Sequence, residues 1–490
     1  MLAAFSRFCG GSASSVRRRG VSRLVATALT TGLVAAGVLS GTGTADADTQ
    51  AQSQSGATAT LDGLKTYGEA VIHRAGGDLK VAAGLFEMSV EDGGMLQTYC
   101  IDMYNPAQKD AKYQEAPWSG TSLGTNKSAG KIRWILQNSY PQVNDLAVLA
   151  ERAGVGSLTE QDAAVGTQVA IWRYSDGANV DAVGSRAEKL ADYLEKSARA
   201  VAEPRASLTL DPPAVSGHTG ERLGPVTVHT NARGVTVIPP TDAAISGVRI
   251  VDDKGKAVTS VKDGSRLYFD VPENTAEGIG GQASSASAGG SGTATLTVQA
   301  STTVPVGRAF ASENRSQTQI LAGSSETTVS ATASANWAAK GPIPALSAGE
   351  NCAEGVLDIS ASDAGDKPFT FKLMGGEHTI PAGASRTVTV PLQEDQAYDF
   401  TITGPNGFSQ RFTGILDCRT QSGEGGMTAQ TVDEPSPATQ GDTSRGTTNL
   451  AATGGSGATS MITGAAIALV VVGGAVLVLL RRKETTRDTD

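Results

Sequence analysis

The chain has 490 residues and a formal net charge of −9, from 40 Lys and Arg against 49 Asp and Glu. This length predicts several domains, and an acidic chain with basic clusters only at its two termini argues against a nucleic-acid partner. The 4 histidines, His73, His218, His229 and His378, lack the paired spacing of a zinc site, so we expect neither a metal nor another cofactor.

The first 47 residues have the order of a secretory signal peptide. Arg17-Arg18-Arg19 precede an apolar stretch from Leu24 to Leu39, and Ala45-Asp46-Ala47 supplies the small residues of a cleavage site. We therefore expect residues 1–47 to be removed on export. A short linker over residues 48–60 should then begin the mature chain.

Residues 61–204 predict a domain that mixes strands with helices. Thr159-Glu160-Gln161-Asp162 has the spacing of a helix-capping box, and Ser175-Asp176-Gly177 is typical of a helix end. Shorter helical patterns run from Leu146 to Ala153 and from Ser185 onward, the latter with Val201 on its apolar face. The segment is therefore expected to be α+β.

Two short motifs in this segment carry the chemistry. The first is Tyr99-Cys100-Ile101-Asp102, and the second is Thr167-Gln168-Val169-Ala170-Ile171-Trp172 in the middle of the predicted helix. Gln168 falls on the apolar face of that helix, where a carboxamide without hydrogen bonds would cost about 1–3 kcal/mol. A chemical use for Gln168 is one explanation, and a hydrogen-bonded core glutamine near a core cysteine is the other.

Together the two motifs resemble those of the thioester domains in surface adhesins of Gram-positive bacteria, and the resemblance extends across much of residues 61–204. It implies that the Cys100 sulfur is joined to the Gln168 side-chain carbonyl with loss of ammonia. Other residues of the motifs would form the environment of this bond: Tyr99, Asp102, Thr167, Ala170 and Trp172. The bond would capture an amine, either a protein lysine or a polyamine, and would be consumed in one event. The chain would then not be an enzyme and would have no catalytic residues.

Two other functions are weighed against covalent adhesion. A cysteine hydrolase would need a histidine base for Cys100, and His73 is the one histidine in this segment, with no protease signature around either residue. A passive cell-surface scaffold would need no chemistry at all. The mass of the folded protein separates the scaffold from the adhesin, because only a thioester removes one ammonia.

Residues 205–337 predict a β-sandwich module, because Thr- and Val-rich runs alternate in polarity between turns. The expected strands are Ala206–Leu210, Val226–His229, Val235–Ile238, Val248–Val251, Leu267–Val271 and Ala294–Val298. The Gly- and Ser-rich stretch 278–292 is expected to be a flexible insertion.

Residues 338–420 predict a second all-β module that looks like a small immunoglobulin-like domain. Its expected strands are Phe369–Leu373, Arg386–Val390 and Tyr398–Ile402, with a hairpin turn at Pro405-Asn406-Gly407. Cys9 is lost with the signal peptide, which leaves three cysteines outside the cell. If Cys100 forms a thioester, Cys352 and Cys418 are expected to form a disulfide.

The C-terminal region predicts attachment to the cell envelope. Residues 421–449 are polar and predict a disordered stalk, and Met461 to Leu480 is an uncharged run long enough to span a membrane, followed by Arg481-Arg482-Lys483. Before it stands a pentapeptide that resembles a sortase signal of high-GC actinobacteria: Leu450, Ala451, Ala452, Thr453 and Gly454. The partners implied are the membrane before sorting, a sortase and peptidoglycan, and a plain membrane anchor is the alternative.

Overall fold

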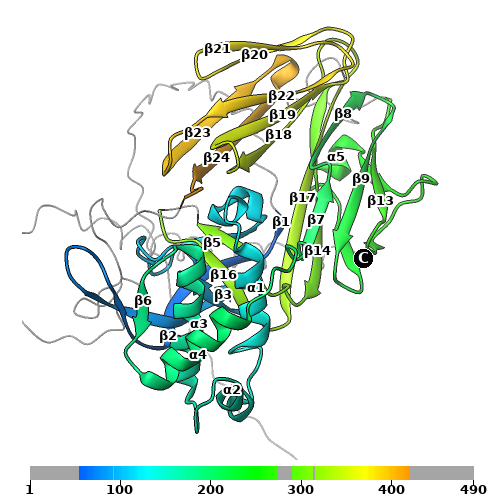
Figure 1. The fold of residues 1–490 in the computed structure, drawn as a ribbon. Coiled ribbons are helices and arrows are strands. Elements are labelled where there is room, and N and C mark those ends of the chain that lie inside the picture. The colour runs from blue at the N-terminus through cyan, green and yellow to red at the C-terminus, as the bar shows by residue number, and fades with distance from the viewer. Residues whose placement is uncertain (1–54, 92, 274–289, 313–314, 420–490) are drawn as a thin grey trace, which may run out of the picture. The chain divides into compact units, whose positions relative to one another are not determined.

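A computed structural model describes residues 55–91, 93–273, 290–312 and 315–419 (Figure 1). The predicted signal peptide, stalk, sorting signal and span at 461–480, and most of the predicted insertion at 278–292, lie outside these ranges. Among the described residues, no helix has both the length and the apolar character needed to cross a membrane.

The first domain is built on a seven-stranded sheet with the strand order β3-β4-β16-β15-β5-β2-β6. Two long strands, β2 and β3, pair along most of their length and alternate buried with more exposed side chains, so one face of the sheet is turned to the core. The strands are β2 (Thr58–Ile72), β3 (Leu79–Val90), β4 (Met95–Cys100), β5 (Lys112–Ala116), β6 (Val180–Ala182), β15 (Ala309–Ser312) and β16 (Gln319–Ser324).

Four helices accompany this sheet, with two short 3-10 turns before the first (Figure 1). The capping box at Thr159 and Asp162 is confirmed, and the helix it begins is buried over most of its length. Gly166 allows the last helix to approach closely, because a Cβ there would lie 2.5 Å from the Ala187 carbonyl. The elements are η1 (Trp118–Gly120), η2 (Ser122–Gly124), α1 (Ala129–Asn138), α2 (Leu146–Arg152), α3 (Glu160–Ser175) and α4 (Ser185–Ser197). We expected Val201 to lie on the apolar face of α4, but this helix ends at Ser197, so that expectation is wrong.

This sheet contains strands from outside the predicted bounds of the first domain, residues 61–204. Strands β15 and β16, at 309–324, belong to the sheet of the first domain, although the sequence pattern assigned them to the sandwich at 205–337. Part of the predicted linker at 48–60 also forms strands, since β1 is Ser55–Gly56 and β2 begins at Thr58. The reason is that strand pairing is non-local, so an apolar run does not show which sheet it will join.

Most strands of the sandwich, at residues 208–302, therefore lie between two parts of the first domain along the chain, and two further strands lie at 55–56 and 327–338. One sheet has the order β1-β17-β14-β10-β12, with β8 paired to β17, and the other has the order β11-β13-β9-β7. This segment is rich in strands, as expected, and its assignment as a β-sandwich stays a prediction. Its elements are β7 (Leu208–Asp211), β8 (Ala214–His218), β9 (Arg222–Thr230), β10 (Val235–Ile238), α5 (Ala243–Ser246), β11 (Arg249–Val251), β12 (Ser260–Val261), β13 (Arg266–Asp270), β14 (Gly292–Thr302) and β17 (Thr327–Ala338).

The third module is all-β, as predicted, with its own core of aromatic and aliphatic side chains. Its strands form the arrays β18-β19-β22, β20-β21 and β23-β24, and the Cys352–Cys418 disulfide is confirmed. The immunoglobulin-like assignment stays a prediction. The elements are β18 (Pro344–Asn351), β19 (Val356–Asp363), β20 (Phe369–Leu373), β21 (Gly376–Ile380), β22 (Ser385–Pro391), β23 (Gln396–Thr403), the turn η3 (Pro405–Gly407) and β24 (Ser409–Leu416).

Candidate thioester site

Cys100 is the last residue of β4 and is buried, with 1% of its surface exposed. β4 pairs with β16 in antiparallel register, which sets Cys100 opposite Gln319. Just beyond the strand, the Ile101 N–H donates to the Thr318 carbonyl at 3.1 Å. The segment that leads into β16 therefore runs beside the segment that leaves β4.

This pairing brings the side chain of Gln317 to the cysteine. The Cys100 Sγ directly contacts the Gln317 Oε1, although the two residues are 217 positions apart in the sequence. Gln317 is fully buried, and its backbone carbonyl accepts a hydrogen bond from the Tyr113 hydroxyl at 2.8 Å. A thioester joins a cysteine sulfur to a carboxamide carbon, so a sulfur in contact with a buried carboxamide is the arrangement that this bond requires.

Gln168 approaches the same cysteine in a different way. Its Oε1 accepts from the Cys100 backbone N–H at 3.1 Å, and its Nε2 donates to the Cys100 carbonyl at 2.8 Å. The structure thus brings the two predicted residues together through the backbone of Cys100 and not through its sulfur. That Gln168 supplies the acyl group stays a prediction. In this structure α3 passes the end of β4, and two hydrogen bonds to the Cys100 backbone satisfy the buried Gln168 carboxamide.

The other residues predicted around the bond divide into two groups. Tyr99 and Thr167 hydrogen-bond away from the sulfur: the Tyr99 hydroxyl donates to the Tyr140 carbonyl at 2.9 Å, and the Thr167 hydroxyl donates to the Ala163 carbonyl at 2.6 Å. Ala170 is fully buried in the core. Asp102 and Trp172, in contrast, both influence the titration of Cys100. The Asp102 backbone carbonyl also lies 3.1 Å from Sγ.

Burial and nearby carboxylates make this a site that disfavours charge. Burial raises the pKa of the Cys100 thiol well above its usual value, and the carboxyl groups of Asp176 and Asp102 raise it further. Burial likewise raises the pKa of Asp102 to about 8 and that of Asp176 to about 7, each above an ordinary 3.8. A free thiol here is therefore protonated at neutral pH, and it is a weak nucleophile toward external reagents.

The geometry gives no support to a cysteine–histidine pair. The Nδ1 of His73 lies 2.8 Å from an Asp78 carboxylate oxygen, and its Nε2 lies 3.2 Å from one of Asp181. Both ring nitrogens are thus engaged by carboxylates, and His73 is partly exposed whereas Cys100 is buried. A hydrolase built on Cys100 would need a base that His73 does not supply in this arrangement.

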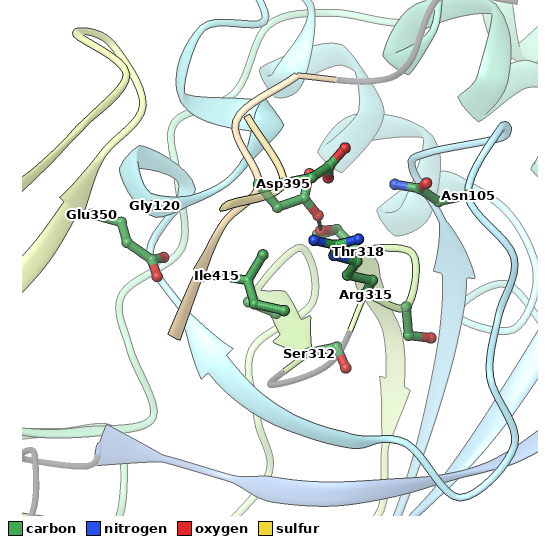
Figure 2. Close-up of a pocket in the computed structure, with 11 residues that line it drawn as sticks. Asn105, Gly120, Ser312, Arg315, Thr318, Glu350, Asp395 and Ile415 are labelled. Atoms are coloured by element: carbon green, nitrogen blue, oxygen red, sulfur yellow. Dashed lines mark hydrogen bonds between the residues drawn. The ribbon is translucent and has the colours of Figure 1, made fainter. Parts of the chain in front are cut away.

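A small pocket borders the segment that carries Gln317 (Figure 2). Ser316 and Thr318, on either side of Gln317, line it together with Asp417 of the third module, and the Thr318 hydroxyl donates to an Asp417 carboxylate oxygen at 2.9 Å. Its volume of about 10 Å³ is the space that roughly one water molecule needs. Figure 2 shows Asn105 pointing toward the same space.

Carboxylates gather at this pocket. One oxygen from each of Glu394, Asp395 and Asp417 lies within 4.8 Å of the others, a spacing that a cation could bridge. Burial raises the pKa of Asp417 to about 6 and that of Glu350 to about 7. No second feature points to a bound ion, and we assign no metal to this cluster.

Fold and site together define a protein with a buried cysteine–glutamine contact in an α+β domain, followed by an all-β module. Comparison with protein families agrees for the first domain: residues 97–200 match the model of the thioester domain. Residues 344–415 match the model of the bacterial phospholipase C C-terminal domain. The segment that matches the thioester-domain model includes Cys100 and Gln168 and ends before Gln317.

Two solved structures are similar to this chain over much of its length. The Bacillus anthracis TIE protein is 15% identical, covers 74% of this chain and 82% of its own, and has a TM-score of 0.26. The thioester domain of the Staphylococcus aureus TIE protein is 13% identical, covers 58% of this chain and 98% of its own, and has a TM-score of 0.17. These scores are too low to carry an argument. No curated protein matches the sequence.

Sequence reasoning missed Gln317. The signal available was Gln317-Thr318-Gln319 directly before the apolar run Ile320-Leu321-Ala322, where polar carboxamides lead into a buried strand. Residues 61–204 contain Gln168, whose predicted burial called for an explanation, whereas the sequence pattern assigns the segment that holds Gln317 to the module at 205–337.

Proposed function

We propose that this chain is a bacterial surface protein that stores a thioester between the Cys100 sulfur and the Gln317 side-chain carbonyl and uses it to attach covalently to an amine. The observation that carries the proposal is the contact of Sγ with the Gln317 carboxamide in a site closed to bulk water. The match of residues 97–200 to the thioester domain supports it.

Bond formation follows from this geometry. The Cys100 sulfur attacks the Gln317 carboxamide carbon, the thiol proton passes to the departing nitrogen, and ammonia leaves. Gln168 holds the Cys100 backbone through two hydrogen bonds and so keeps the sulfur aimed at its target. Burial then protects the product, because a thioester in contact with water would hydrolyse.

When the thioester reacts with an amine, the Cys100 sulfur is the leaving group and no longer the nucleophile. A primary amine, such as a lysine side chain or a polyamine, attacks the same carbon and forms an amide, the carbon–sulfur bond breaks, and the amine proton ends on the Cys100 thiol. An amide is more stable than a thioester, so the attachment is not expected to release. The protein is consumed in this single event, which makes it a reactant and not an enzyme.

Intact mass of the folded protein tests the proposal. Residues 49–419 should show a deficit of about 17 Da, the mass of the ammonia lost when a nucleophile displaces an amide. Cys100→Ala and Gln317→Ala should each restore the full mass of their own sequence. Gln319→Ala is the matched control, because Gln319 lies opposite Cys100 in the sheet but its Oε1 accepts from the Thr98 hydroxyl at 2.9 Å.

Three other results would each change the conclusion. A wild-type mass without a deficit would leave the passive scaffold as the remaining function. If the mass deficit is lost in Gln319→Ala but kept in Gln317→Ala, the acyl group belongs to Gln319 and not to Gln317. A deficit kept in both and lost in Gln168→Ala would restore the original pairing.

We also propose that the protein is exported and anchored to the cell wall of an actinobacterium. The support lies wholly in the sequence, in the order of signal peptide, sorting pentapeptide, apolar span and basic tail. A sortase would cut after Thr453 and join it to peptidoglycan. Thr453→Ala should move the protein from the wall fraction to the detergent-soluble membrane fraction, and a wild type already soluble in detergent would indicate a plain membrane anchor.

A further inference from the structure

Trp172 carries a buried hydrogen-bond donor beside the reactive sulfur. Its side chain is 2% exposed, and its indole N–H makes no hydrogen bond of normal geometry to any group among the described residues. Buried donors are nearly always satisfied, so an unused one has a free-energy cost and calls for a reason. Trp172 is four residues after Gln168 on α3 and therefore shares the helix face that meets Cys100.

The Trp172 side chain acts on that sulfur as a hydrogen-bond donor, which lowers the pKa of the Cys100 thiol. Burial, Asp176 and Asp102 raise the pKa of Cys100, whereas the backbone at Asp102 and the Trp172 side chain lower it. Among the described residues, Cys100 also raises the pKa of Tyr113, whose hydroxyl donates to the Gln317 carbonyl. Trp172 is thus a side chain that favours negative charge on the sulfur in surroundings that otherwise oppose it.

We propose that the Trp172 indole N–H stabilises the Cys100 sulfur at the moment when the bond between this sulfur and the acyl carbon forms or breaks. As an amine attacks the Gln317 carbonyl, the carbon–sulfur bond breaks and its electron pair stays on the sulfur. The indole N–H donates to the developing thiolate until the proton released by the amine neutralises it. By microscopic reversibility the same donor assists thioester formation, when ammonia leaves. The inference rests on the proposed thioester and assigns a further reactive-site residue to it.

Trp172→Phe removes the N–H and keeps an aromatic ring in the core. Its aminolysis by methylamine, followed by intact mass, should be roughly 10- to 100-fold slower than in the wild type, the factor expected for losing a hydrogen bond to a charged group. Trp337→Phe is the matched control. Trp337 is also 2% exposed and also has a buried indole N–H without a partner in the described part of the chain, but it lies in β17 of the sandwich.

A second measurement does not require the thioester. In a Gln317→Ala background Cys100 is a free thiol, and the pH profile of its alkylation should shift to higher pH when Trp172→Phe is added. If the phenylalanine variant fails to fold, 3-benzothienylalanine at position 172 replaces the N–H with sulfur in a ring system of nearly the same shape and takes its place in both assays.

The outcomes separate this inference from the proposed function. If the wild type has its mass deficit but Trp172→Phe reacts as fast as Trp337→Phe and the alkylation profile is unchanged, the role of Trp172 is refuted and the thioester stands. If the wild type has no deficit, the proposed function fails, whatever Trp172 does to the thiol. Slowed aminolysis together with a shifted alkylation profile supports both.

Discussion

The chain uses its cysteines in two contrasting ways. In the third module Cys352 and Cys418, 66 residues apart, form a disulfide that joins the two ends of one β-pattern. In the first domain Cys100 meets Gln317 across 217 residues, and most strands of the β-sandwich lie between them along the chain. Both cysteine sites are buried, but only the disulfide joins two residues of a single module.

This difference shows which covalent links a sequence reveals. The disulfide could be inferred because its cysteines bracket one module, and the two ends of a compact module often lie close together. The partner of Cys100 depends on β4 pairing with β16, and no local pattern states that pairing. A reactive pair formed by strands from two separate parts of the chain is therefore found from tertiary structure.

The largest expected effect concerns the position of the acyl group. A biotinylated primary amine added to residues 49–419 should label the wild type at Gln317, and Gln317→Ala should abolish labelling. The double variant Cys352→Ser/Cys418→Ser should still be labelled, because the disulfide has no part in the reaction. Peptide mapping of the labelled protein locates the attachment, and label found on Gln168 would contradict the geometry described here.

The next effect concerns stability of the third module. Removing the disulfide with Cys352→Ser/Cys418→Ser should lower the free energy of unfolding by about 4 kcal/mol, the chain-entropy value for a loop of this size. Denaturant titration followed by circular dichroism measures the change. An unaltered unfolding midpoint would mean that the link has no stabilising role, and simultaneous loss of amine labelling would mean that the two cysteine sites are coupled.

We expect Gln168 to stabilise the site through its hydrogen bonds to the Cys100 backbone and not to form the acyl bond. Gln168→Ala leaves the buried N–H and C=O of Cys100 without their partners, at about 1–3 kcal/mol for each group. We expect a less stable domain and slower formation of the thioester, with the mass deficit still reached. Gln168→Glu keeps an acceptor for the Cys100 N–H but loses the donor to its carbonyl, so it should fall between alanine and the wild type.

A smaller and graded effect is expected with pH. Burial raises the pKa of Asp102 to about 8 and that of Asp176 to about 7, so the folded protein holds protons that the unfolded chain has already lost. Stability should therefore be greatest near pH 4 and fall as pH rises toward 8, by at most about 1.4 kcal/mol per pH unit for each group. Thermal unfolding at several pH values measures the slope. Asp102→Asn with Asp176→Asn should flatten it, and a slope that remains would assign it to other groups.

The sequence by itself determined the local features of this protein. The capping box of α3 and the strands β10 and β20 occur as expected, because hydrogen-bonding caps and alternating polarity act over a few residues. It also identified Cys100 as the cysteine without a disulfide partner and Cys352 with Cys418 as a pair. Each of these inferences needed only neighbouring residues or the two ends of one module.

Only the tertiary structure decided which glutamine meets the sulfur. Gln168 and Gln317 are both fully buried, and both contact Cys100, one through its backbone and the other through its side chain. A carboxamide can act as a double hydrogen-bond partner or as an acyl donor, and the residue type does not distinguish the two. The choice follows from where α3 crosses the end of β4 and from the entry of β15 and β16 into the sheet of the first domain. In that sheet β15 pairs with β5, and β5 pairs with β2, which begins at Thr58. Packing sets both of these, because burying the apolar faces of these strands is what joins two distant segments into one core.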